Sequence, residues 1–187
     1  MELEFKPVVA GDIDRLRPFY GMRPNKTCDS VFLDSFLWKD YYHVQCAVSE
    51  GRAVLWLMEK DGQVSTAMPL CREEDLPYFF QQMVDYFSGV LHKPFYISLA
   101  DEEAVQCLNL DPALFEVEEQ VDLKDYLYSG EELRKLEGKK FVKKRNHLNG
   151  FKRTYEGRYE YRRLCCSDRH EVWQFMERWR QHREEVG

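Results

Sequence analysis

Apolar residues follow two different spacings along the first part of the chain. In residues 12–20 and 74–88 they recur every three or four positions, which is typical of amphipathic helices. Four short apolar-rich runs predict strands instead: residues 4–9, 44–49, 53–59 and 63–69. The last three runs are separated by Glu50-Gly51 and Asp61-Gly62, which are hairpin turn signals. The pattern therefore predicts helices packed on a sheet of hairpin-linked strands.

Shorter elements follow up to residue 137. We predict a helix that begins after an N-cap at Asp29-Ser30, because these side chains can accept the free amides of a first turn. We also predict strands over residues 95–99, 115–120 and 122–128, and helices over residues 101–108 and 130–136. Helices and strands in this order predict an α+β fold with a mixed sheet flanked by helices.

The last part of the chain repeats the way it begins. A long helix over residues 139–156 is predicted to precede a strand over residues 159–164 and a helix over residues 168–183. We therefore expect a first domain in residues 1–137, a linking helix in residues 138–157 and the start of a truncated second copy in residues 158–187. An apolar stripe on the last helix lacks a predicted partner, so we expect this chain to be part of a longer protein.

Composition narrows the class of protein. Apolar residues make up 44% of the 187 residues, which is enough for an ordered core. The chain has no predicted secretion signal and no run of roughly 20 apolar residues, so we expect a cytoplasmic protein without an integral membrane segment. The six cysteines are scattered, and neither Cys165-Cys166 nor His43 with Cys46 has the spacing of a zinc site. We expect neither disulfides nor a bound metal.

Charge is unevenly distributed along the chain. Residues 134–163 hold 12 Lys and Arg against 3 Asp and Glu, although the whole chain has a net charge of −6. A cationic stretch in an acidic protein predicts an anionic partner such as a nucleic-acid backbone, a phospholipid surface or a phosphorylated substrate. A solvated helix face is the alternative, because charge runs are often no more than that.

The predicted linking helix has an unusual apolar stripe. Its apolar positions are Phe141, Leu148, Phe151 and Tyr155. A period of 3.6 residues takes the stripe through positions 144 and 145, yet these are Lys144 and Arg145. Either their stems extend past the edge of the core, or this turn faces a cleft that requires cations. We favour the cleft.

The segment from Gly138 to Phe151 is the most distinctive string in the chain, and reads GKKFVKKRNHLNGF. It resembles the G-K-K-x-x-x-K-R-N-H-x-x-x-F motif of a bacterial family related to the C-terminal domain of phosphatidylglycerol lysyltransferases and, more distantly, to the Fem peptidyltransferases. Phe36-Leu37-Trp38 resembles that family's early F-x-W signature. The resemblance implies a pair of folds of the GCN5-related N-acetyltransferase type, joined by the basic helix.

The resemblance also implies an aminoacyl or acyl transferase that uses aminoacyl-tRNA as donor. In such an enzyme Lys144, Arg145 and Asn146 are the candidates for stabilising negative charge on the reacting carbonyl. The candidate anion-binding residues are Lys139, Lys140, Lys143, His147 and Arg153. We expect no cofactor, because residues 68–75 lack the glycines that hold the pyrophosphate of coenzyme A and carry three acids.

A second function from a different class remains open. The same cations can hold phosphates without any chemistry, which predicts a non-catalytic module that recognises tRNA or anionic lipid. The expected partners are therefore tRNA or another phosphate-bearing substrate, and anionic phospholipid. The residues alone do not separate the two functions.

Overall fold

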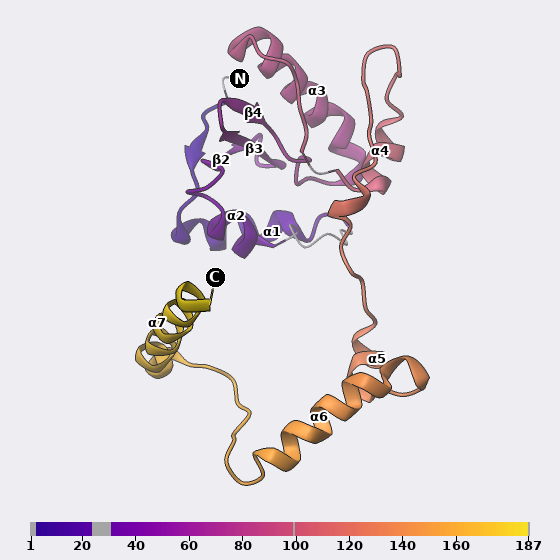
Figure 1. Ribbon diagram of the computed structural model, residues 1–187. Helices are drawn as coiled ribbons and strands as arrows, with labels where there is room; N and C mark the ends of the chain where they lie inside the picture. Colours follow the sequence, from indigo (N-terminus) through magenta and orange to yellow (C-terminus); the bar gives the residue numbers. More distant parts are fainter. Residues whose placement is uncertain (1–2, 24–30, 99, 187) are drawn as a thin grey trace. The chain divides into compact units, whose positions relative to one another are not determined.

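The computed structural model describes residues 3–23, 31–98 and 100–186. The chain divides into two compact units, unit 1 (Met1–Leu127) and unit 2 (Tyr128–Gly187). Figure 1 labels strands β2 to β4 and helices α1 to α7.

Unit 1 contains an antiparallel sheet with strand order β1-β2-β3-β4. Its strands are β1 (Lys6–Pro7), β2 (Gln45–Ser49), β3 (Ala53–Lys60) and β4 (Gln63–Ser65). Both predicted hairpin turns are confirmed, since Glu50, Gly51, Asp61 and Gly62 all have positive φ angles, as type I′ turns require. These local turns set the order of β2, β3 and β4.

The central strand β3 is buried on both faces. Ala53 and Leu55 belong to one core cluster and Val54 and Trp56 to another, because successive strand residues point to opposite sides of a sheet. The cluster of Val54 and Trp56 includes residues of α1 (Ile13–Tyr20) and α2 (Phe32–Leu37). The 3₁₀ turn η1 (Ala10–Asp12) precedes α1. The cluster of Ala53 and Leu55 includes residues of α3 (Leu76–Tyr86) and α4 (Glu102–Leu108). Helices thus cover both faces of the sheet (Figure 1).

Most of the predicted helices are confirmed. The helix predicted over residues 74–88 is α3, with the 3₁₀ turn η2 (Glu73–Asp75) before it and the π-helical turn η3 (Phe87–Leu91) after it. The helix predicted to start at Asp101 is α4, and the Asp101 carboxylate accepts the Ala104 amide at 2.9 Å. The predicted cap at Asp29-Ser30 lies outside the described residues, and the N-cap of α2 is Val31.

Three predicted strands do not form in the described part of the chain, and a fourth, over residues 95–99, is reduced to a single bridge. Residues 115–120 and 159–164 have no regular structure, and residues 122–128 include only the end of the 3₁₀ turn η4 (Val121–Leu123). Of residues 95–99, Ile97 forms one isolated parallel bridge with Thr66. A strand needs a neighbour for its amides and carbonyls, and alternating apolar residues do not show whether one exists. The predicted mixed sheet is therefore antiparallel, apart from that bridge.

Unit 2 consists of helices and connecting segments. They are α5 (Gly130–Lys135), η5 (Lys139–Phe141), α6 (Val142–Thr154), η6 (Cys166–Asp168) and α7 (Arg169–Val186). The α7 stripe of Val172, Phe175, Met176 and Trp179 is exposed. No helix in the described ranges combines the length and the apolar character that a membrane crossing requires. The domain boundaries and the second copy stay predictions.

Candidate anion-binding site

The basic helix begins at a tight turn between α5 and α6. Ser129 caps α5, and Leu136 ends it in the left-handed conformation with a φ of 51°. Gly138 follows with a φ of 82°, which a glycine adopts at little cost. This turn fixes where the cations of η5 and α6 begin.

Arg145 holds this turn from inside α6. Its Nη1 donates to the Leu136 carbonyl and, at 2.9 Å, to the Gly138 carbonyl. Both carbonyls lie just beyond the end of α5, where helix carbonyls lack amide partners and a cation is favourable. Arg145 is accordingly only partly exposed. Its guanidinium therefore makes a structural contact that was not predicted from the sequence.

The other predicted site residues lie on the helix surface. All seven are exposed: Lys139, Lys140, Lys143, Lys144, Asn146, His147 and Arg153. Lys140 is paired with Glu132 at 2.8 Å. Within the described ranges, Lys139, Lys143, Lys144 and Arg153 have no hydrogen bond or ion pair with a carboxylate. Their charge is available to a ligand.

A hollow of about 200 Å³ lies beside this helix, and its lining is mainly acidic. It is formed by Ser129, Glu131, Glu132, Lys135, Glu137 and Phe141. Neither Lys144 nor Arg145 lines it. The hollow is thus unlike the cationic cleft that we predicted for these two residues, and the exposed cations present an open surface.

The apolar stripe of α6 continues beyond the helix as a group of aromatic rings. Phe151 lies 4.8 Å from Tyr155 and 5.1 Å from Tyr159, measured between ring centroids. The sequence interpretation missed Tyr159, which it assigned to a strand. The signal was present, because Phe151, Tyr155 and Tyr159 follow one another at intervals of four residues.

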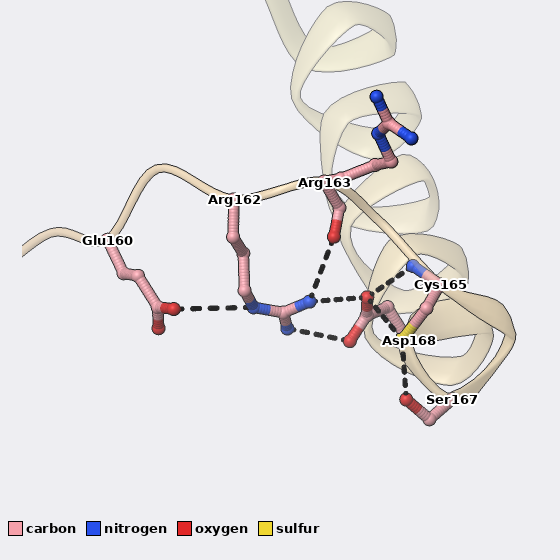
Figure 2. A network of polar contacts seen from close by, with 6 residues as sticks. All are labelled: Glu160, Arg162, Arg163, Cys165, Ser167 and Asp168. Carbon is pink, nitrogen blue, oxygen red and sulfur yellow. Dashed lines mark hydrogen bonds and ion pairs between the residues drawn. The ribbon is translucent and has the colours of Figure 1, made fainter.

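A polar network fixes the start of α7 (Figure 2). Two Arg162 nitrogens each donate to an Asp168 oxygen at 2.7 Å, and the Cys165 amide donates to Asp168 Oδ2 at 2.8 Å. Hydrogen bonds from Arg162 and then from Cys165 hold the pKa of the Asp168 carboxyl far below its usual value. Asp168 thus combines an ion pair with an N-terminal capping contact.

We predict that this network is lost only in strong acid. The carboxyl of Asp168 has an ordinary pKa of 3.8 and a lower one in the folded chain, so its stabilisation is complete above pH 3.8 and is lost as the pH falls through the folded-state value. An NMR titration of the Asp168 carboxyl carbon measures this directly. Arg162→Gln should raise the midpoint, and a wild-type midpoint at or above 3.8 contradicts the prediction.

The buried thiols are poor nucleophiles. Burial raises the pKa of Cys71 to about 11 and also raises the pKa of Cys46, so both stay protonated near neutral pH. The described residues contain no group of three or more His, Cys, Asp or Glu side chains arranged to hold a metal. Among the described groups, the cations of α6 remain the strongest chemical feature.

The family assignment rests on most of the sequence. Residues 22–187 match the family described as "Phosphatidylglycerol lysyltransferase, C-terminal". This chain belongs to that family. The match to the phosphatidylglycerol lysyltransferase C-terminal family includes the basic helix and confirms the resemblance stated above.

One solved structure shares the fold of this family member. It is a conserved protein of unknown function from Bacteroides thetaiotaomicron VPI-5482, with a TM-score of 0.84 and 24% sequence identity. The alignment covers 98% of this chain and 61% of that protein, so the chain spans less than two thirds of its neighbour. No curated protein matches this chain. At this identity the likeness shows the fold alone.

Proposed function

We propose that this chain is part of an aminoacyl transferase that binds aminoacyl-tRNA as its donor through the cations of η5 and α6. Membership of the lysyltransferase C-terminal family supports the reaction class. The observation that carries the donor site is the run from Lys139 to Arg153, which holds seven Lys and Arg and no acid. A polyanion gains most from such a surface, because each phosphate that it neutralises releases counterions.

The reaction makes modest demands on the protein. An amine or hydroxyl adds to the carbonyl of the aminoacyl ester and loses one proton, and the bond to the ribose oxygen of the tRNA then breaks as that oxygen takes up one proton. Lys144 and Asn146 are exposed donors that can stabilise the developing oxyanion. Arg145 has N–H groups besides Nη1 for the same task, although its clearest role is at the turn.

The non-catalytic alternative has an observation of its own. Lys144 and Asn146 lie on an exposed surface, whereas catalysis gains from a site that excludes water. A module that only holds tRNA phosphates needs no such enclosure.

We also propose that residues 158–187 begin a second acyltransferase-like domain, which the exposed apolar stripe of α7 supports.

The salt dependence of tRNA binding tests the donor site. We predict that Lys143→Gln, Lys144→Gln and Arg153→Gln together reduce the slope of log affinity against log salt by about 2 to 3, since each lost phosphate contact removes roughly 0.7 to 0.9. Fluorescence anisotropy with labelled tRNA between about 50 and 300 mM salt measures the slope. Arg145 is left unchanged in this variant because it holds the α5–α6 turn.

A matched control removes the same charge from unit 1. Arg17→Gln, Arg72→Gln and Lys93→Gln replace three exposed cations and should leave the slope unchanged. Equal slopes for the wild type and the α6 variant contradict the proposal. Transfer of a labelled aminoacyl group from charged tRNA then separates the two functions, because tRNA binding without transfer by a full-length family member favours the non-catalytic module.

A further inference from the structure

The aromatic group beside the cations has no role in the donor site described above. Phe151, Tyr155 and Tyr159 are 46%, 44% and 46% exposed. Their rings contact one another, yet about half of each residue remains accessible. Rings that served only the core of unit 2 would be expected to be buried, as Phe141 is.

Cations lie at both ends of this aromatic group. Lys144 lies two helical turns before Phe151 on the same stripe. At the other end the Arg158 guanidinium lies 5.4 Å from the centre of the Tyr155 ring. Stacking surfaces between cations are the combination that proteins use for unpaired nucleotides, whose bases have open faces and whose phosphates are charged.

We propose that Phe151, Tyr155 and Tyr159 form a stacking platform for unpaired nucleotides of an RNA ligand. This inference rests on the proposed function and names the part of the tRNA that is held, its single-stranded 3′ end. Bases within a duplex are stacked on one another and cannot offer their faces to a side chain, so the platform selects single-stranded RNA. The lysines and Arg153 then bind phosphates of either form.

A membrane surface fits this stripe less well. A helix that lies in the lipid interface needs a broad apolar face, and the 13 residues of α6 include only Val142, Leu148 and Phe151 as large apolar side chains. The two tyrosines add hydroxyl groups to the same surface. A narrow aromatic stripe matches nucleotide faces better than acyl chains.

Two RNA probes of equal length test the platform in the full chain. We predict that Phe151→Ala and Tyr155→Ala each weaken binding to a single-stranded oligonucleotide by roughly 5- to 100-fold, as the loss of one stacked base does. Binding to a blunt duplex should change less than about 2-fold, because phosphate contacts remain. Tyr96→Ala is the control, since Tyr96 is similarly exposed (47%) but lies in unit 1.

Conservative variants separate stacking from folding. Tyr155→Phe should keep the single-strand affinity, whereas Tyr155→Leu should lose it although both retain apolar surface. Rescue by leucine, or equal losses on both RNAs, overturns the platform. If Phe151→Ala and Tyr155→Ala lose binding to phosphatidylglycerol-containing vesicles while their RNA binding is unchanged, the platform is also overturned, in favour of a lipid contact.

The platform and the donor site fail in distinguishable ways. If the platform alone is wrong, the α6 variant still flattens the salt slope while the aromatic variants bind RNA as the wild type does. If the donor site is wrong, the α6 variant leaves the salt slope unchanged.

Discussion

Phe87→Ala should lower the free energy of unfolding of unit 1 by about 3 to 5 kcal/mol, the usual cost of removing a buried phenylalanine. Phe87 is fully buried in the cluster that joins α3 to the sheet. Its ring lies 5.3 Å from Phe95, which is also 5.3 Å from Phe80. Alanine leaves a cavity between these rings, and most domains of this kind have only about 5 to 15 kcal/mol in total.

Urea unfolding followed by tryptophan fluorescence measures this loss as a lower midpoint at unchanged slope. Phe87→Leu keeps much of the volume and should lose less than Phe87→Ala. Leu114→Ala is the control, because Leu114 is highly exposed and its loss should change stability by less than about 0.5 kcal/mol. A cost below about 1 kcal/mol for Phe87→Ala would show that the surrounding rings close the cavity.

Arg23→Met should cost about 3 to 5 kcal/mol, because it leaves the Asp101 carboxylate buried without its partner. The two side chains are 7% and 8% exposed and form a two-point ion pair at 3.0 and 3.1 Å. Asp101 also caps α4 through the Ala104 amide. One carboxylate therefore connects the chain after α1 to the start of α4.

A double-mutant cycle separates the pair from the cap. Asp101→Asn retains an oxygen for the Ala104 amide while it removes the charge. If the pair is coupled, Arg23→Met with Asp101→Asn should cost less than the two single changes added together, by roughly 0.5 to 3 kcal/mol in urea unfolding. Strict additivity would mean that the two side chains act independently.

Local patterns predicted much of unit 1. The helices over residues 12–20 and 74–88 follow from periodicity, and the Asp101 cap and the two hairpin turns follow from short-range chemistry. The strands predicted over residues 115–120 and 122–128 do not form, and local patterns could not reveal this. Their alternation resembles that of real strands, but a strand forms only where another segment pairs with it.

The candidate site, like the fold, could be predicted from the sequence only in part. The sequence determined the cationic run, its place on a helix and the family motif, because charge and helical period are local properties. Only the tertiary structure placed Arg145 on the carbonyls of Leu136 and Gly138, and only it brought Tyr159 against Phe151. A helical period places a residue on a face of its helix, whereas its contacts depend on how the chain turns back at residues with unusual φ angles such as Leu136.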